Sequence, residues 1–94
     1  MARAKSILSN ERWCQVCGNP YTLHCHHIFY GPNRKNSDEW GCWVYLCERH
    51  HTQAPDGIHF NRKLDVKFKK MAQQAFEEKY GHDKFMEVFG KNWL

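Results

Sequence analysis

Two stretches in the first half of the chain have the pattern of short β-strands. Residues 21–29 alternate loosely between apolar and polar positions, and residues 40–46 are rich in aromatic and β-branched side chains. The tetrapeptide Tyr30-Gly31-Pro32-Asn33 ends the first stretch, because Gly and Pro interrupt regular structure. The polar segment 33–39 is expected to be a loop. The pattern therefore predicts a pair of strands joined by a polar connection.

A helical period begins at residue 62 and continues to residue 80, with charged residues opposite an apolar stripe. The stripe consists of Leu64, Phe68, Met71, Ala72, Ala75 and Phe76. Gly81 fits the C-cap of this helix, and Asp83 is a plausible N-cap for a second, short helix that Gly90 ends. The second helix should turn Phe85, Val88 and Phe89 inward, and Trp93-Leu94 should dock on the core. These elements predict a small α+β domain.

Length and composition narrow the class of protein. The chain has 94 residues, enough for one domain with a modest core that a structural metal would help to stabilise. Lys and Arg number 14 against 10 Asp and Glu, which is consistent with a nucleic-acid partner but does not establish one. No apolar run is long enough for a membrane span. The basic lead, residues 1–12, is expected to be flexible or weakly helical. It lacks the apolar core of a secretory signal, which predicts a cytoplasmic protein.

Four residues have the spacing of a zinc site. Two residues separate Cys14 from Cys17, and two separate Cys47 from His50, so each pair can supply two corners of a tetrahedron from one turn. Because they flank the two strands, one Zn²⁺ would close the hairpin in a treble-clef-like arrangement. A redox CxxC pair is the alternative, but it normally opens a helix in a βαβ unit. The other thiols, at Cys25 and Cys42, are expected to be small buried hydrophobic residues.

Two adjacent histidine pairs suggest a second site. If His50 binds zinc, His51 faces elsewhere and can meet the pair His26-His27. Neighbouring residues on a strand point to opposite faces, so one histidine of that pair could bind a metal while the other acts as a general base. The alternative is that all of these histidines serve one structural zinc site or a hydrogen-bond network. Two further histidines, His24 and His82, have no such context and are expected at the surface.

These motifs resemble the HNH (ββα-metal) endonucleases, of the small phage and prophage type. The matching pieces are Cys14-x2-Cys17-Gly18, His26-His27-Ile28 and Leu46-Cys47-x2-His50-His51. The resemblance implies a zinc-stapled ββα-metal core over residues 13–61, followed by a helical extension over residues 62–94. It implies that His26 and His51 hold a catalytic divalent metal (Mg²⁺, Mn²⁺, Ni²⁺ or Zn²⁺) and that His27 is the general base. Cys42 stands where the family has asparagine, and Asn33, Asn36 or Asn61 could substitute.

Of these asparagines Asn61 attracts most attention, because His59 two residues earlier could supply a third metal ligand. The resemblance implies hydrolysis of DNA phosphodiester bonds, by nicking or double-strand cutting, with little sequence specificity. Small proteins of this type are associated with phage recombination or packaging, so the resemblance implies a partner from one of these processes in the bacterial host. Whether the protein forms a homodimer is left open. The basic residues expected to contact the phosphate backbone are Arg34, Lys35, Arg49, Lys63, Lys67 and Lys70. The competing interpretation is a zinc-binding module that binds nucleic acid or protein without catalysis.

Overall fold

Two antiparallel strands form the sheet, as the sequence predicts. In a computed structural model, which describes residues 3–94, β1 covers Leu23–His27 and β2 covers Trp43–Cys47. The register pairs Leu23 with Cys47 and His27 with Trp43. Both strands are shorter than the stretches expected from the pattern. The register sets the end of β2 beside the start of β1, so residues that follow Cys47 emerge next to the histidines of β1.

The connection between the strands is helical, which corrects the expected loop. A 3-10 turn, η1 (Gly31–Asn33), leads into α1 (Arg34–Trp40), which Gly41 ends in a left-handed conformation. Ser37, fully buried, accepts a hydrogen bond from Phe29 N and donates one to Phe29 O, at 3.1 and 2.6 Å. Asn33 and Asn36 donate to the carbonyls of Phe89 and Val88. Polar side chains of this segment thus form hydrogen bonds with backbone groups of Phe29, Val88 and Phe89, which explains why a packed segment is polar.

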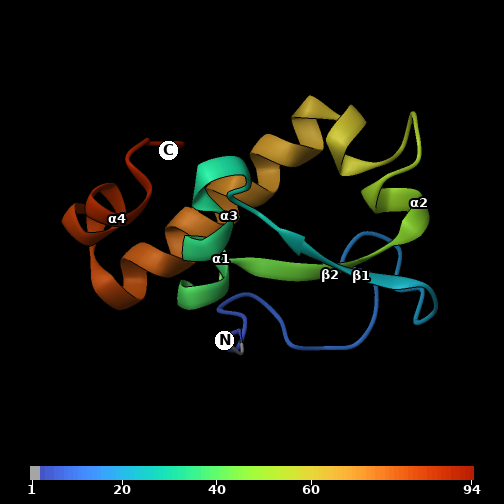
Figure 1. Cartoon of the computed structure of the whole chain (residues 1–94), viewed down its shortest axis with the longest axis horizontal. Helices are drawn as coiled ribbons and strands as arrows, with labels where there is room; N and C mark the ends of the chain where they lie inside the picture. The colour runs from blue at the N-terminus through green and yellow to red at the C-terminus, as the bar shows by residue number, and fades with distance from the viewer. Residues whose placement is uncertain (1–2) are drawn as a thin grey trace.

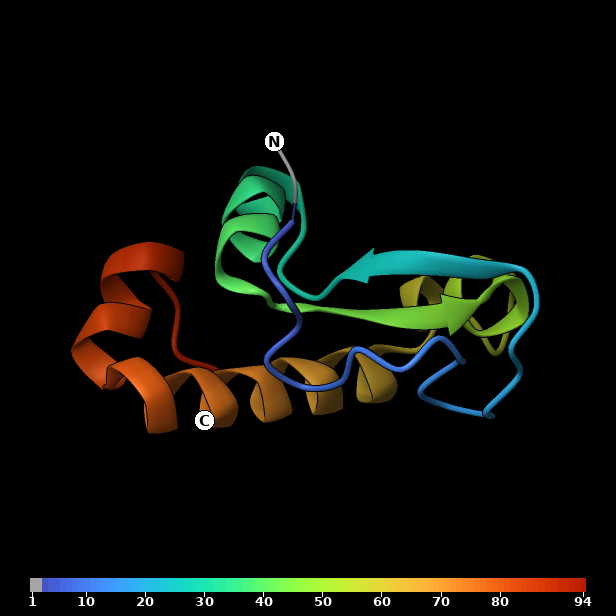
Figure 2. The same cartoon turned by 90° about the horizontal axis from the view of Figure 1, so that it is seen from below.

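The elements after β2 are helical, and the longest matches its predicted bounds. The first three are α2 (Glu48–His51), the 3-10 turn η2 (Ile58–Phe60) and α3 (Arg62–Tyr80). Helix α4 (His82–Phe89) then folds back against the end of α3, and Gly81 precedes it where Asp83 was expected to act as the cap. Figures 1 and 2 show α3 running beside the strands, with α2 and α4 at opposite ends of the molecule.

One hydrophobic core joins both halves of the chain. Ile28 and Leu46 of the hairpin half and Phe76 and Phe85 of the helical half are all fully buried in the same cluster. On the expected stripe of α3, by contrast, Met71 is 39% exposed. Among residues 3–94, no helix is both long and apolar enough to span a bilayer. The predicted α+β class is confirmed: residues 3–94 form a compact domain with a two-stranded sheet and four α-helices.

The basic lead contains no helix among its described residues, 3–12, and it packs against the rest of the domain. Met1 and Ala2 lie outside the residues that the structure describes. Ile7 N donates to Gly41 O at 2.9 Å, and Ser6 Oγ donates to Trp43 O at 2.6 Å. The segment is therefore an ordered, extended strap that lies along β2 and its approach. It packs because Ile7 and Leu8 supply apolar contacts to the core.

Replacement of Gly41 by alanine is expected to destabilise the domain by about 2–5 kcal/mol. The φ of Gly41 is 73°, and an added Cβ would meet the carbonyl oxygen of Lys5 in the strap. The left-handed conformation costs about 1–2 kcal/mol for a residue with a side chain, and the overpacking adds about 1–3 kcal/mol. Denaturant unfolding measures the total. Gly90→Ala, at φ 76° with open space around it, is the matched control and should lose only the conformational part. Equal losses in the two variants would contradict the close approach at Gly41.

Candidate functional site

Three thiols and one imidazole form a cluster at the end of β2. The ligand atoms of Cys14, Cys17, Cys47 and His50 all lie within 4.8 Å of one another. The Cys17 and Cys47 sulfurs are 3.7 Å apart, and a zinc tetrahedron with bonds of about 2.3 Å has sulfur–sulfur edges of about 3.8 Å. The Nδ1 atom of His50 lies 3.3 Å from Cys47 Sγ and 3.9 Å from Cys14 Sγ. This donor set is compatible with the zinc site that the spacing predicts.

Local backbone geometry prepares the first two ligands. Gly18 N donates to Cys14 O at 2.8 Å and Gly18 has φ 78°, so the chain turns back immediately after Cys17. Gln15 N donates to Tyr45 O at 3.0 Å, which ties this turn to β2. Burial raises the pKa of the Cys14 thiol, but backbone amides, including that of Val16, lower it more, so the net pKa lies below its ordinary value. A lowered pKa favours the thiolate, which is the form that binds metal.

Three histidines form a second cluster, which contains both residues expected to bind the catalytic metal. The rings of His26, His51 and His59 make a nearly equilateral triangle, with centroids 5.0 to 5.2 Å apart. The Nε2 atoms of His51 and His59 are 3.3 Å apart, close to the edge of a tetrahedron with metal–nitrogen bonds of about 2.0–2.1 Å. The structure thus brings His59, the third ligand suggested by the sequence, to the same point as the other two.

The state of His26 fits a metal ligand. Its side chain is 1% exposed, and no residue among 3–94 forms a hydrogen bond with its Nε2 atom. A buried polar nitrogen without a partner is unfavourable and calls for a ligand. Burial and the neighbouring rings of His51 and His59 lower the pKa of His26 to about 3, and burial with His59 and His24 lowers that of His51 to about 4. Both rings are therefore neutral near pH 7, with lone pairs free to bind a cation.

One short helix supplies both clusters. Cys47 ends β2, and α2 carries His50 and His51 directly after it. Successive side chains of an α-helix diverge by about 100°, so His50 turns toward the thiols while His51 turns toward β1. There the even-numbered positions His24 and His26 share one face, because side chains on a strand alternate. The expected division of labour between His50 and His51 agrees with this geometry.

His24 is not an isolated surface residue, which corrects the expectation from sequence. Its Nδ1 atom lies 2.9 Å from Nδ1 of His51, and the two rings meet edge to face. If Nδ1 of His51 donates to His24, Nε2 of His51 is left as the free lone pair facing His59. Such a second partner fixes the tautomer and orientation of a ligating imidazole. The position of His24 two residues before His26 was the available signal. His82, by comparison, is exposed and pairs only with Glu77, as expected of a surface residue.

His27 lies outside the histidine triangle and has a partner of its own. Its Nε2 atom is 2.8 Å from Oδ1 of Asp38, with the His27 side chain 13% exposed. Asp38 comes from α1, which packs against β1. With Nε2–H donating to the carboxylate, the lone pair of His27 is at Nδ1. The sequence interpretation missed Asp38, because it treated residues 33–39 as a loop. The Gly41 stop signal, with Pro32 ahead of the segment, could have revealed the helix.

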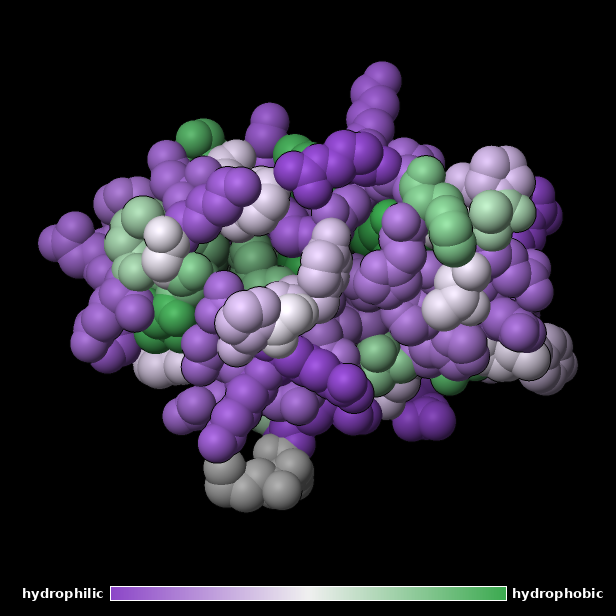
Figure 3. Space-filling model, turned by 45° about the horizontal axis from the view of Figure 1, so that its top comes forward, coloured by the Kyte–Doolittle hydropathy of each residue, from purple (hydrophilic) through white to green (hydrophobic). Residues whose placement is uncertain are grey.

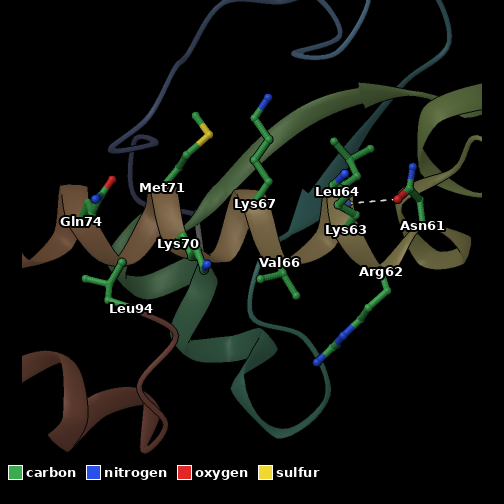
Figure 4. A pocket seen from close by; sticks show the side chains of 10 residues that line it. All are labelled: Asn61, Arg62, Lys63, Leu64, Val66, Lys67, Lys70, Met71, Gln74 and Leu94. Atoms are coloured by element: carbon green, nitrogen blue, oxygen red, sulfur yellow. Dashed lines mark hydrogen bonds between the residues drawn. The ribbon is translucent and has the colours of Figure 1, made fainter.

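Cys42 stands at the position where the sequence resemblance leads us to expect an asparagine, and a thiol does not supply the chemistry of an amide. The thiol is fully buried, and burial raises its pKa to about 12, so it stays neutral. Asn61 is the N-cap of α3: its Oδ1 accepts a hydrogen bond from Leu64 N at 3.1 Å (Figure 4), so this oxygen is not free to orient a catalytic histidine. The loop after β1 is braced by Ser37 instead. The leftover Cys25 is partly buried and outside both clusters, so the expectation of a fully buried residue fits Cys42 better than Cys25.

No family model, curated protein or solved structure matches this chain. Its chemistry must therefore be inferred from the two clusters themselves.

All six basic residues expected to contact DNA are exposed. Arg34 and Lys35 begin α1, while Arg49 on α2 also pairs with Asp56 at 2.9 Å. The remaining three are lysines of α3. They line a shallow groove of about 1050 Å³ together with Leu64, Val66 and Leu94. Lys67 and Met71 project on one side of α3, and Val66 and Leu94 lie on the other (Figure 4). The face shown in Figure 3 is mostly hydrophilic, with small separate apolar patches.

Proposed function

We propose that this protein is a metal-dependent DNA endonuclease of the HNH type, with β1, β2 and α2 as its ββα-metal core. The observation that supports it best is the histidine triangle: three imidazoles converge on one point, and the buried Nε2 of His26 has no partner among residues 3–94. A structural zinc site does not need these residues. Four other residues already make a complete zinc-binding set nearby.

The proposed division of roles follows from the donors present. His26, His51 and His59 would hold a divalent cation, which supplies charge neutralisation at the scissile phosphate and the leaving oxygen. His24 orients His51 through the contact between their Nδ1 atoms. The thiol-containing cluster would hold Zn²⁺ and keep α2 in position at the end of β2. Both groups of ligands therefore depend on the same four-residue helix.

His27 is proposed as the general base, with Asp38 as the residue that positions it. The hydrogen bond from Nε2 to Asp38 sets the tautomer, so Nδ1 can accept a proton from an attacking water. Asp38 also stabilises the imidazolium that results, as a carboxylate does when it holds a catalytic histidine. His27 directly follows His26 and is the last residue of β1, so the proposal places the base at the end of the strand that also supplies the triangle.

The substrate proposed is the phosphate backbone of DNA, contacted with little base readout. Among residues 3–94, the groove on α3 is lined by no side-chain carboxylate and by four cationic side chains: Arg62, Lys63, Lys67 and Lys70. Cations at exposed positions contact phosphates without reading sequence. Each such contact makes binding more sensitive to salt. Low sequence specificity is the expected consequence.

Nicking of supercoiled plasmid tests this function. Zinc-loaded protein is expected to convert plasmid to relaxed circles when Mg²⁺, Mn²⁺ or Ni²⁺ is added, and to leave it supercoiled without an added divalent ion. Gel electrophoresis follows the reaction, and His82→Ala is the control, because His82 lies outside both clusters. Protein that is folded and binds DNA but never nicks it with any of these ions would contradict the enzyme. It would favour the non-catalytic zinc-binding module.

A further inference from the structure

A second, smaller cavity lies beside the histidine triangle and is not needed for the roles assigned above. Its volume is about 220 Å³, and it opens between the residues after β1, α3 and the C-terminal segment. The lining residues that matter for its chemistry are Tyr30, Asn33, Arg62, Lys69, Lys91 and Trp93. This volume is below the range of about 300–1,000 Å³ that is usual for drug-sized ligands. The cavity therefore suits a small charged group.

The cavity contains a buried cation. Lys69 is 3% exposed, although lysine is rarely buried unless it is paired. Its ammonium group donates to Asp65, which is also 3% exposed and also accepts from Tyr30 Oη at 2.9 Å. An ammonium group has three N–H donors. Asp65 takes one, and the hydrogen bonds of residues 3–94 leave the others without a partner.

The walls carry an excess of positive charge. Arg62 lies 3.4 Å from Asp65, and the ammonium of Lys91 is 4.3 Å from the ring centre of Trp93. Asp65 is the single side-chain carboxylate, within residues 3–94, that pairs with any of the cavity's three cations: Arg62 and Lys69 contact it, and Lys91 has no ion pair. Two positive charges are left in excess. Because Arg62 and Lys91 are exposed at the rim while Lys69 is buried, the charges surround the opening at different depths.

Tyr30 is shared between this cavity and the surroundings of the proposed catalytic site. Its ring centre is 5.5 Å from that of His59 and 6.3 Å from that of His26. The Lys69 ammonium lies 3.9 Å from the centre of the same ring. One aromatic ring therefore lies beside both the buried cation of the cavity and two histidines of the triangle, and Arg62 follows His59 by three positions.

We propose that this cavity is a phosphate subsite, which receives the phosphate adjacent to the scissile one in a nucleic-acid strand. Arg62, Lys69 and Lys91 bind its oxygens through charge-assisted hydrogen bonds. The rings of Tyr30 and Trp93 pack against the attached sugar or base, as aromatic side chains do in single-strand binding sites. The inference rests on the proposed nuclease function for its substrate, but the binding can be measured without cleavage.

The test is binding of a hexamer of thymidylate to zinc-loaded protein with no catalytic metal added. The indole resonance of Trp93 in ¹H–¹⁵N spectra is expected to shift on titration. Arg62→Ala and Lys91→Ala should each weaken binding about fivefold to tenfold, as expected for loss of a charge-assisted contact. Both residues are exposed, so the variants should fold, whereas loss of Lys69 would leave Asp65 buried without its principal partner. Lys79→Ala removes the same charge at the far end of α3 and should bind within twofold of the parent.

Two results would overturn the subsite. One is equal weakening by Lys79→Ala and by the two cavity variants, which would mean that only net charge matters. The other is inorganic phosphate binding as tightly as the hexamer, which would assign the cavity to a free anion. The proposed nuclease activity is tested separately, by the nicking of plasmid. If the hexamer binds in the cavity and plasmid is never nicked, the cavity remains a phosphate-binding site for a nucleic-acid strand and the enzyme fails. Metal-dependent nicking with no effect of the cavity variants on binding keeps the enzyme and overturns the subsite.

Discussion

Replacing His27 by alanine is expected to lower the rate of plasmid nicking about a thousandfold, since general-base catalysis contributes about 10²- to 10⁴-fold. The substitution should leave the metal site intact, because His27 lies outside the triangle of His26, His51 and His59. His26→Ala should instead weaken the binding of Ni²⁺ or Mn²⁺, which calorimetric titration measures. Loss of activity with unchanged metal affinity is thus the signature of the base, and loss of both is the signature of a ligand.

Asp38→Asn separates positioning from catalysis. Asparagine can still accept the hydrogen bond from Nε2 of His27, but it lacks the charge that stabilises the imidazolium. The rate should fall about 10- to 100-fold, as is common when the partner of a functional histidine is changed. His82→Ala is the histidine control and should nick at the parental rate. If His27→Ala nicks within twofold of the parent, another group accepts the proton and the assignment of His27 is wrong.

Removal of zinc is expected to unfold the domain. Structural zinc contributes about 10–16 kcal/mol in zinc-finger peptides, which equals or exceeds the whole stability of about 5–15 kcal/mol of a typical domain. The cluster connects the turn at Cys14 and Cys17 to α2 at the end of β2. Without the ion, its three cysteine side chains would face one another with no cation between them. Strong chelation should therefore abolish the cooperative thermal transition seen by circular dichroism.

Cys47→Ser should reproduce the effect of chelation, and native mass spectrometry should show that the variant has lost one zinc ion. Cys25→Ser is the matched control: it also removes a thiol, but Cys25 lies outside both clusters, so zinc and the thermal transition should be retained. A circular dichroism spectrum that does not change after zinc is stripped would show that the fold does not depend on the metal.

The elements that could be predicted from sequence are those whose cause is local. The period of Leu64, Phe68, Ala72 and Phe76 placed α3 at its observed bounds, because one face of the helix must be buried along its whole length. The spacing of Cys14 with Cys17 and of Cys47 with His50 likewise indicated a four-ligand set that the structure brings within 4.8 Å. Two residues between ligands is a constraint of a single turn, so it can be read without knowing the fold.

Helix α1 and the strap were not predicted, since neither has a periodic apolar face. Ser37 is fully buried because it hydrogen-bonds Phe29, and Asn33 and Asn36 reach the C-terminal end of α4. These partners lie up to 56 positions away in the chain. A polar side chain whose partner is distant looks like a loop residue in the sequence, although it is a tertiary contact in the fold.

By itself the sequence determined which residues can bind metal: the thiols, the histidine pairs and their short spacings. Only the tertiary structure decided how the histidines are shared. It brought His59 to the triangle, made His24 a partner of His51 and gave His27 a carboxylate, Asp38, eleven positions away. The physical reason is the antiparallel register of β1 and β2, which sets the start of one strand beside the helix that follows the other. Ligand type is a property of single residues, whereas a coordination site is a property of the register that brings them together.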